Sequence, residues 1–385
     1  MSNRPLVLMD TTLRDGEQTP NVSFSPAEKL RIASTLLCDV GVNRIEVGSA
    51  RVSAGEARAA RLIADWASAA GWLHAVEMLG FCDGDRSVDW IAGTGVKRVN
   101  LLVKGSEQHC RLQLGEDLDQ HLRRVADTLQ AARSAGLEVS GVYLEDWSRG
   151  VAENSEYVFS LVRGLVALGV RRVYLADTLG VLEPRGAYRY VRLMRRSFPD
   201  LLFEFHAHDD YGLATANCLA AARAGVDGLH TTVNGMGERA GNACLAEVTV
   251  VVRDHAGRAT GVNEARLPEL SGLVAQASGC GIVHNAPVVG EHVFTQTAGI
   301  HADGDRKASL YCTELAPERF GRRRQYALGK LSGRASLAYN LRELGLELDP
   351  RVFELLLERV RALGDDKRRV EASELAGLAG LGPTA

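Results

Sequence analysis

The sequence predicts an α/β protein, a (β/α)₈ (TIM) barrel followed by a helical carboxyl-terminal subdomain. From residue 6 to about residue 258, short β-branched or leucine-rich runs alternate with longer amphipathic stretches. Such alternation is typical of a parallel sheet with helices outside it. About eight of these units, over roughly 250 residues, match the size of a (β/α)₈ barrel. Beyond residue 258 the alternation stops and helical patterns dominate.

Each barrel unit is assigned from its composition. The predicted strands are Leu6–Met9, Arg44–Val47, Ala75–Leu79, Arg98–Leu102, Glu138–Leu144, Arg172–Leu175, Leu202–His206 and Gly228–Val233. The predicted helices between them include Pro26–Asp39, Ala54–Ala69, Glu116–Ala135, Ser155–Leu168, Arg185–Ser197 and Ala214–Ala224. Gly41, Gly71, Gly136 and Gly225 stand where helix C-caps are expected. The competing fold is a doubly wound open sheet, but no Gly-x-Gly-x-x-Gly turn follows the first strand, which disfavours a dinucleotide-binding version.

We predict two domains, a barrel over residues 1–258 and a helical subdomain over residues 259–385. The subdomain should hold helices at Val262–Ser278, Arg334–Leu344, Pro350–Leu363 and Glu371–Leu378, with a mixed segment at Val288–Gly304. The final six residues, GLGPTA, are expected to be frayed.

The composition excludes several classes of protein. The 385 residues carry a formal net charge of -3 without a block of like charge, so a nucleic-acid partner is not expected. The basic run Arg322–Arg324 is either a solvated face or an anion contact. Seven cysteines without a Cys-x-x-Cys pair indicate free thiols in a reducing cytoplasm. No apolar stretch reaches membrane-spanning length and no signal segment begins the chain.

Polar side chains gather where the predicted strands end, which is where barrel enzymes build their sites. The clusters are Asp10–Gln18, Glu46 with Ser49, Tyr143 with Glu145 and Asp146, Asp177-Thr178, His206 with His208, and Asn234–Asn242. His206 and His208 share one face of their strand, because alternate residues of a strand do so. They are either metal ligands or packed core histidines, and the acidic residues and glycine that follow favour ligands.

Asp15, His206, His208 and an amide oxygen of Asn242 would form a mixed oxygen and nitrogen site. Such a site suits Mn²⁺ or Mg²⁺, with Zn²⁺ or Co²⁺ possible. Open coordination positions would accept a bidentate substrate such as an α-keto acid, whose ketone the metal would polarise. Arg14 is next to Asp15 and is either a surface or Asp177-paired arginine, or a cation that stabilises developing negative charge. We favour the second reading.

Three further residues have two readings each. Glu46 and Glu238 either orient the ligands or Arg14, or are ordinary ion-pair partners. Thr178 either binds a substrate carboxylate through its hydroxyl group or caps the next helix.

Three motifs, TTLRDGEQT, HAHDDYGLATAN and NGMGERAGN, resemble those of the 2-isopropylmalate, homocitrate and citramalate synthase family. The resemblance extends from about residue 6 to about residue 340 and implies a metal-dependent Claisen condensation of acetyl-CoA on a TIM barrel. It implies that Asp15, His206, His208 and Asn242 bind the metal and that Arg14 is catalytic. It also implies that Thr178 contacts the keto acid.

The segments VYLEDWSRG and GEHVFTQTAGIHADGD most resemble the bacterial citramalate synthases of this family. In that group an apolar pocket with a tyrosine closes on the keto acid, and the matching positions are Leu79, Leu102 and Tyr143. This lining offers no cation to a distal carboxylate, which disfavours 2-oxoglutarate. Pyruvate is therefore favoured, with 2-oxoisovalerate as the alternative. The longer family members carry a carboxyl-terminal regulatory domain, which we expect this chain to lack.

The resemblance also implies a homodimer in which FTQTAGIHADG places His301 over the partner barrel, with Tyr311 nearby to act on acetyl-CoA. The expected base is His301, with Glu145 as its partner or as the base itself. This makes the chain an acyltransferase in branched-chain amino-acid biosynthesis. The alternative is a carbon–carbon lyase such as hydroxymethylglutaryl-CoA lyase. That enzyme carries a catalytic cysteine in the loop after strand eight, whereas NGMGERAGN has none before Cys244.

Overall fold

The computed structural model describes residues 5–381 as two compact units. The first ends at Ile282 and the second begins at Val283. Each unit is described by itself below. The last four residues of the GLGPTA segment, predicted to be frayed, lie outside the described residues.

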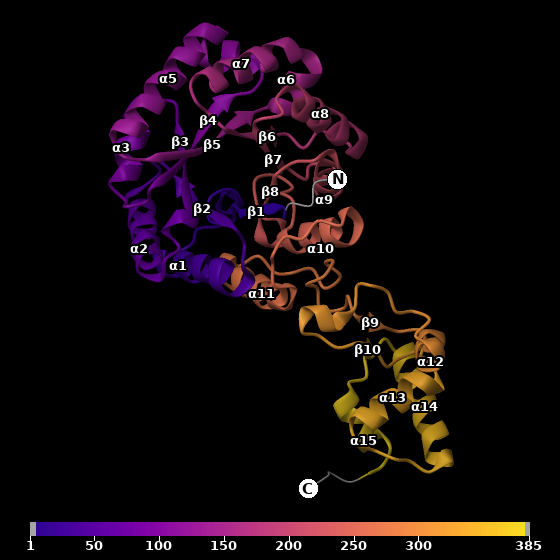
Figure 1. The fold of residues 1–385 in the computed structure, drawn as a ribbon. Coiled ribbons are helices and arrows are strands. Elements are labelled where there is room, and N and C mark those ends of the chain that lie inside the picture. The colour runs from indigo at the N-terminus through magenta and orange to yellow at the C-terminus, as the bar shows by residue number, and fades with distance from the viewer. Residues whose placement is uncertain (1–4, 382–385) are drawn as a thin grey trace. The chain divides into compact units, whose positions relative to one another are not determined.

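The first unit is a closed barrel of eight parallel strands in sequential order, which confirms the predicted fold (Figure 1). The strands are β1 (Val7–Asp10), β2 (Arg44–Ser49), β3 (Val76–Phe81), β4 (Arg98–Lys104), β5 (Glu138–Glu145), β6 (Arg172–Asp177), β7 (Leu202–Ala207) and β8 (Gly228–Thr231). The barrel closes where β8 pairs with β1, with Val7 opposite Gly228. All carboxyl ends of the strands therefore meet at one mouth.

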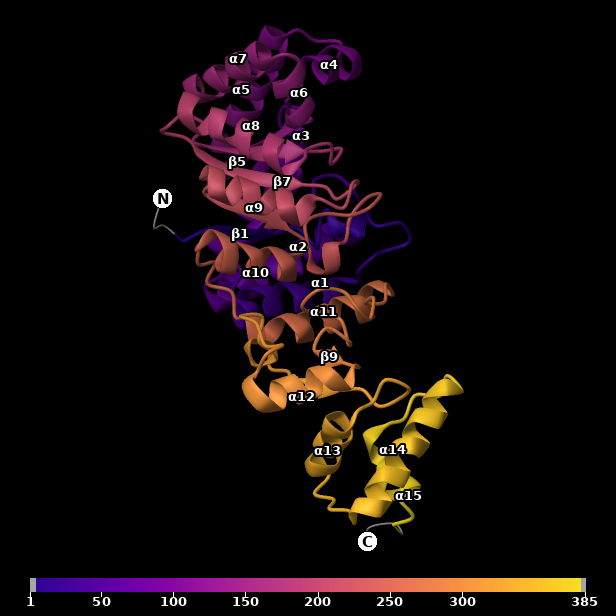
Figure 2. The same ribbon diagram turned by 90° about the vertical axis from the view of Figure 1, so that its right-hand side faces the viewer.

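Helices form a ring outside the strands, as the two views of the ribbon show (Figures 1 and 2). They are α1 (Pro26–Ser34), α2 (Ala54–Ala70), α3 (Arg86–Ala92), α4 (Glu107–His109), α5 (Leu118–Ser134), α6 (Trp147–Glu153), α7 (Ser155–Ala167), α8 (Pro184–Ser197), α9 (Ala214–Ala224), α10 (Leu245–Ala256) and α11 (Leu267–Ser278). A capping box at Ser25 and Glu28 begins α1. Gly41, Gly71, Gly136 and Gly225 have left-handed φ values of 80°, 80°, 70° and 99°, which explains glycine at the ends of helical segments.

The domain boundary differs from the prediction of residue 258. The β/α alternation does end there, because α10 stops at Ala256. However, α11 packs against α1 and the π-helical turn Thr35–Val40 that follows it. Its buried Leu267, Leu270 and Val274 belong to the first unit, so that unit extends to Ile282. Periodicity alone does not reveal which core a helix joins.

The inside of the barrel is unusually polar. Alternate residues of each strand point inward, and among them Glu46, Glu77, Asn100 and Glu204 are all buried. A small apolar and aromatic cluster lies in the same interior, formed by Met9, Leu79, Tyr143, Tyr174 and the partly buried Leu102. These inward-facing residues form the floor of the site described below.

The second unit has its own apolar core, built from Leu328, Leu337, Leu341, Leu356, Leu357, Val360, Val370 and Leu375. Its elements are β9 (Thr295–Gln296), α12 (Gly299–Ala308), β10 (Gln325–Tyr326), α13 (Arg334–Glu343), α14 (Pro350–Asp365) and α15 (Leu375–Leu378). Arg322 donates to the carbonyls of Gly290 and Glu291 at 2.6 and 2.7 Å. Part of the basic run therefore fixes a loop. Among the described residues, no helix is long and apolar enough to cross a membrane.

Candidate active site

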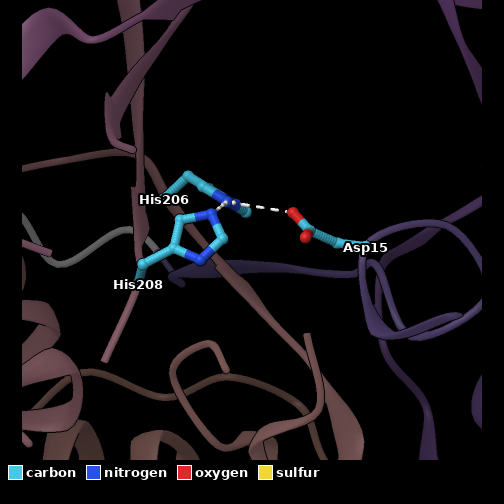
Figure 3. A group of neighbouring side chains, drawn as sticks. All are labelled: Asp15, His206 and His208. Atoms are coloured by element: carbon cyan, nitrogen blue, oxygen red, sulfur yellow. Dashed lines mark hydrogen bonds and ion pairs between the residues drawn. The ribbon is translucent and has the colours of Figure 1, made fainter. Parts of the chain in front are cut away.

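Three of the predicted metal-binding side chains converge at the mouth of the barrel (Figure 3). Asp15 follows β1, His206 lies on β7, and His208 follows β7. The Nε2 atom of His206 is 3.1 Å from Asp15 Oδ2 and 3.4 Å from His208 Nε2. The potential ligand atoms of the group all lie within 4.8 Å of one another. One carboxylate and two imidazoles thus point at one small volume.

Each of the four predicted ligand residues has a buried polar atom without a hydrogen-bond partner among the described residues. These atoms are Asp15 Oδ1, His206 Nδ1, His208 Nδ1 and Asn242 Oδ1. Buried polar atoms normally find partners, because an unpaired one costs about 1–3 kcal/mol. Carboxylate, imidazole and amide groups are the donor set that a divalent cation accepts. The residues present therefore fit a divalent metal.

The protonation states of the cluster also suit a cation. Burial alone would raise the pKa of Asp15, but the Arg14 guanidinium at 2.9 Å and a hydrogen bond from His206 hold it well below its usual range. Burial, with a smaller contribution from His206, lowers the pKa of His208 to about 4. At neutral pH Asp15 is therefore an anion and His208 is neutral, with a free lone pair.

Asn242 is held by the glycine-rich loop after β8. It forms an isolated β-bridge with His208, and its amide nitrogen donates to the Met236 carbonyl at 2.9 Å. This bond fixes the orientation of the amide and leaves Oδ1 free. Gly237 has a φ of 151°, and a β-carbon there would stand 2.1 Å from Asn242 Nδ2. The loop needs glycine at this position for the amide to fit.

Arg14 is fixed beside the same cluster. Its guanidinium contacts Asp15 at 2.9 Å and Glu46 at 2.5 Å. Burial would lower its pKa, but Asp15 and Glu46 raise it above its usual value, so Arg14 is a permanent cation. The alternative pairing with Asp177 is wrong, because the Asp177 carboxylate accepts from the backbone N–H groups of Val181 and Leu182. Glu46 is buried and orients Arg14.

A cavity of about 190 Å³ opens beside these groups at the barrel mouth. Ten of its lining residues were predicted as site residues, namely Arg14, Asp15, Leu79, Leu102, Tyr143, Glu145, Thr178, His206, His208 and Glu238. The other four are Gln18, Ser49, Phe81 and Ala176. Arg14 is the only cationic side chain in this lining, within the part of the chain that the structure describes.

Three polar residues of the cavity have distinct surroundings. The Thr178 hydroxyl oxygen accepts from the Asp146 N–H at 2.8 Å, which leaves its proton available, and Glu183 caps α8 in its place. Glu145 forms an ion pair with Lys104 of β4. Glu238 has a 56% exposed side chain and pairs with Arg239 at 3.6 Å. Glu238 is therefore an ion-pair partner of Arg239, whereas Glu46 contacts and orients Arg14.

His301 and Tyr311 belong to the second unit. His301 lies on α12, and its ring centroid is 4.2 Å from that of Tyr311. The two predicted acetyl-CoA residues are thus neighbours, as the sequence suggested. Their roles toward the barrel remain predictions.

Sequence reasoning missed residues that support the site from behind. Lys104 was not predicted as a site residue, although it is the last residue of β4 and the carboxyl ends of other strands were expected to carry the site. Arg239 joins two loops, because it pairs with Asp210 at 2.8 Å and donates to the Thr178 carbonyl at 2.7 Å. His230 of β8 was predicted only as a strand residue, without a role at the site. Its signal was an ionisable residue within an apolar strand.

A second histidine and glutamate group occurs in the second unit at His284, Glu291 and His292. All three side chains are exposed, and Arg369 also approaches Glu291 at 4.0 Å. Exposed groups of this kind pair with water and with each other at little cost. The buried group in the barrel is therefore the better metal site.

The fold and the site define a parallel-barrel protein with a candidate divalent-metal centre at the carboxyl ends of its strands. A family model described as HMGL-like matches residues 6–274. A second, described as "Homocitrate synthase post-HMGL domain-like", matches residues 288–368. The chain therefore belongs to the HMGL-like family, in the group that contains the 2-isopropylmalate, homocitrate and citramalate synthases. The predicted family is confirmed.

Relatives with these three names cover nearly the whole chain. It is 39% identical to "Putative (R)-citramalate synthase CimA" of Methanopyrus kandleri, over 97% of this chain and 71% of that protein. It is 40% identical to "Homocitrate synthase AksA" of the same organism, over 96% and 90%. It is 33% identical to the 2-isopropylmalate synthase of Methanocaldococcus jannaschii, over 96% and 70%.

Solved structures support the fold. The hydroxymethylglutaryl-CoA lyase of Bacillus subtilis matches with a TM-score of 0.60 and 19% identity, covering 73% of this chain and 97% of that one. The lyase of Pseudomonas aeruginosa matches with a TM-score of 0.59 and 22% identity, covering 75% and 98%. At this identity the likeness concerns the barrel fold alone.

Proposed function

We propose that this protein condenses acetyl-CoA with an α-keto acid, and that the preferred keto acid is pyruvate, giving citramalate and free CoA. The observation that carries the proposal is the convergence of Asp15, His206 and His208 on one small buried volume beside the fixed cation Arg14. The synthase names of the relatives support the same reaction class.

Asp15, His206, His208 and Asn242 would hold the metal, for which the donor set favours Mn²⁺ or Mg²⁺ over Zn²⁺ or Co²⁺. When bound, a divalent cation polarises the ketone of the keto acid and so makes its C2 atom more electrophilic. The chain's own residues supply the rest of the chemistry.

Arg14 would stabilise the negative charge that develops on the keto oxygen as the new carbon–carbon bond forms. Its guanidinium is held rigidly by Asp15 and Glu46, and a pre-oriented donor needs little rearrangement during the reaction. The free hydroxyl proton of Thr178 is available to the keto-acid carboxylate. Leu79, Leu102 and Tyr143 would close the pocket around the short alkyl end of the substrate.

The reaction requires removal of a proton from the acetyl methyl group. Glu145 lines the cavity, and we assign the proton transfer to His301 with Glu145 as its partner or as the base itself. The enolate attacks C2 of the keto acid, the resulting alkoxide takes up a proton, and water hydrolyses the thioester to release CoA. We propose that His301 and Tyr311 act on acetyl-CoA bound at the partner barrel of a homodimer.

We place the enzyme in branched-chain amino-acid biosynthesis in the cytoplasm. All seven cysteines are free in the structure, which agrees with a reducing compartment. The first product would be a 2-alkylmalate, which is a precursor suited to isoleucine or, with the longer keto acid, leucine.

The second candidate reaction uses 2-oxoisovalerate and gives 2-isopropylmalate. The relatives include an enzyme of that name, and one or two extra methyl groups change pocket binding by only about 1–3 kcal/mol. A lyase of the hydroxymethylglutaryl-CoA type is less well supported. Burial raises the pKa of the Cys244 thiol to about 11, so the cysteine that follows the loop after β8 stays protonated.

Thiol release should be measured with acetyl-CoA and, in parallel, pyruvate, 2-oxoisovalerate and 2-oxoglutarate, with products identified by mass spectrometry. We expect kcat/KM to be highest for pyruvate and negligible for 2-oxoglutarate. A clear preference for 2-oxoisovalerate would make the pocket assignment wrong. Absence of thiol release with every keto acid would overturn the condensation itself.

A further inference from the structure

A buried histidine lies beneath the cavity, and the proposed reaction does not use it. His230 of β8 and Glu204 of β7 are each only 1% exposed, and His230 Nε2 is 3.0 Å from Glu204 Oε2. Glu204 also forms ion pairs with Arg44 and, at 3.1 Å, with Arg172. Glu204 is therefore a carboxylate, which only accepts hydrogen bonds. His230 must carry its proton on Nε2.

The other ring nitrogen faces the cavity floor. With Nε2 donating to Glu204, Nδ1 of the ring has a lone pair that can accept a hydrogen bond. The Tyr143 hydroxyl lies 3.1 Å from Nδ1 and 3.3 Å from Glu46 Oε2. Both can accept the single hydroxyl proton. Glu46 already receives hydrogen bonds from Arg14 at 2.5 Å and Asn100 at 2.8 Å, whereas among residues 5–381 the Tyr143 hydroxyl is the one hydrogen-bond partner of Nδ1.

With its proton on His230, the Tyr143 oxygen turns its lone pairs toward Arg14. Arg14 Nη2 is 3.4 Å from that oxygen, and its guanidinium carbon is 5.6 Å from the centroid of the Tyr143 ring. The pocket wall and the cation at the reacting centre are therefore connected. A hydroxyl that rotates freely would leave both less well defined.

We propose that His230 is a positioning residue for keto-acid recognition: anchored by Glu204, it fixes the Tyr143 hydroxyl, and through it Arg14, at the floor of the cavity. The inference rests on the proposed function, since it concerns how that pocket selects its keto acid. It gives a physical purpose to a polar group buried within a strand, since burying such a group costs free energy unless it is hydrogen-bonded.

The test uses three substitutions of His230 that distinguish the role of Nδ1 from the role of Nε2. In His230→Asn the amide oxygen takes the place of Nδ1 and keeps the acceptor for Tyr143. In His230→Gln the amide reaches the place of Nε2 and keeps the donor to Glu204. His230→Leu removes both. We expect the Gln and Leu variants to lose about 10- to 100-fold in pyruvate affinity, the equivalent of one buried hydrogen bond. We expect the Asn variant to retain most of it.

The readout is the Kd of pyruvate and of 2-oxoisovalerate for the full-length protein with Mn²⁺, measured by calorimetry, together with kcat/KM. A merely structural role would lower the Tm and leave the ratio of the two affinities unchanged, which would overturn the proposal. If the Leu variant fails to fold, the Asn and Gln pair decides. Equal losses in that pair would also overturn it.

Tyr143→Phe provides an independent control. Once the hydroxyl is absent, His230 has nothing to fix, so His230→Gln should cause no further loss of pyruvate affinity in that background. The same fold-loss in both backgrounds would contradict the coupling. A wild-type protein that binds pyruvate but does not condense it would remove the proposed function and leave this inference to be judged on binding. A protein that binds neither keto acid would remove both.

Discussion

A β-carbon on Gly237 would stand 2.1 Å from the amide nitrogen of Asn242, so the loop after β8 can hold this amide only because residue 237 is glycine. Asn242 is also tied to Met236 through its amide nitrogen. Its backbone forms an isolated β-bridge with His208.

The first prediction concerns this contact. Gly237→Ala should displace the Asn242 amide and weaken Mn²⁺ binding by about tenfold or more, the equivalent of losing one supporting interaction of a metal ligand. Calorimetric titration of Mn²⁺ measures the effect. Gly212→Ala is the matched control, because Gly212 also has a positive φ, 68°, but no atom lies within 4 Å of its added β-carbon. Equal losses in the two variants would mean that backbone strain alone is responsible.

Arg14→Ala should lose most of kcat, by about 10²- to 10³-fold, in addition to a loss of pyruvate affinity comparable to that of His230→Gln, because a cation that opposes charge developing in the transition state mainly affects the chemical step. Steady-state kinetics gives kcat, and calorimetry on the same preparation gives the affinity for pyruvate. Arg14→Lys keeps the charge without the forked contacts to Asp15 and Glu46, so it should recover only part of the rate. An unchanged kcat in Arg14→Ala would exclude Arg14 from the mechanism.

Leu102→Ala should enlarge the cavity and shift the preference from pyruvate toward 2-oxoisovalerate. Leu102 is partly buried in the cluster with Leu79 and Tyr143. The expected change in the ratio of kcat/KM values is about tenfold, since one to three methylene groups correspond to about 1–3 kcal/mol. Leu112→Ala, at a 77% exposed leucine outside this cavity, is the control. A ratio that does not move would place the alkyl group of the substrate elsewhere.

Removal of divalent metal by a chelator should abolish turnover and lower the Tm. Asp15, His206 and His208, which converge at the mouth, would then lack the cation that their grouping fits, and ligands that bind only the native state stabilise it. Differential scanning fluorimetry and thiol release, repeated after adding back Mn²⁺, Mg²⁺, Zn²⁺ or Co²⁺, would rank the ions. Full turnover after thorough chelation would contradict the metal site.

Acid should destabilise the barrel through His230. Burial lowers its pKa to about 3 in the folded protein, whereas it is about 6.5 in the unfolded chain. Between these values the unfolded chain binds the proton and the folded protein does not. The contribution of His230 to the free energy of unfolding should therefore be complete above pH 6.5. Below that pH the free energy of unfolding should fall by about 1.4 kcal/mol per pH unit for this one group.

Urea unfolding of the chelated protein between pH 7 and pH 5 would measure this dependence. His230→Asn lacks the titrating ring, so its stability should fall less steeply than that of the wild type. Parallel curves for the two proteins would show that His230 does not cause the acid sensitivity.

Much of this architecture follows from local pattern. Strand and helix periods, with glycine at the ends of helical segments such as Gly71 and Gly225, predict the barrel. Barrel closure then brings all strand ends to one mouth, which is why Asp15 and His206 could be paired from sequence. Glu204, His230 and Glu145–Lys104 could not be paired in this way, because inward-facing contacts depend on register and tilt. The position of α11 likewise depends on tertiary packing against α1.

The charged interior of the barrel has a consequence for engineering. Glu46, Glu77, Arg44 and Glu204 are all buried. Replacing such a charged network as a whole by well-packed aliphatic side chains is often neutral or stabilising, whereas removing one member alone is destabilising. A search for heat-resistant variants that replaces the whole network, guided by stability alone, would therefore remove Glu46, which holds Arg14, and produce robust but inactive proteins. Stabilising substitutions are better sought in the outer helices, where sequence can vary without disturbing the groups beneath the catalytic mouth.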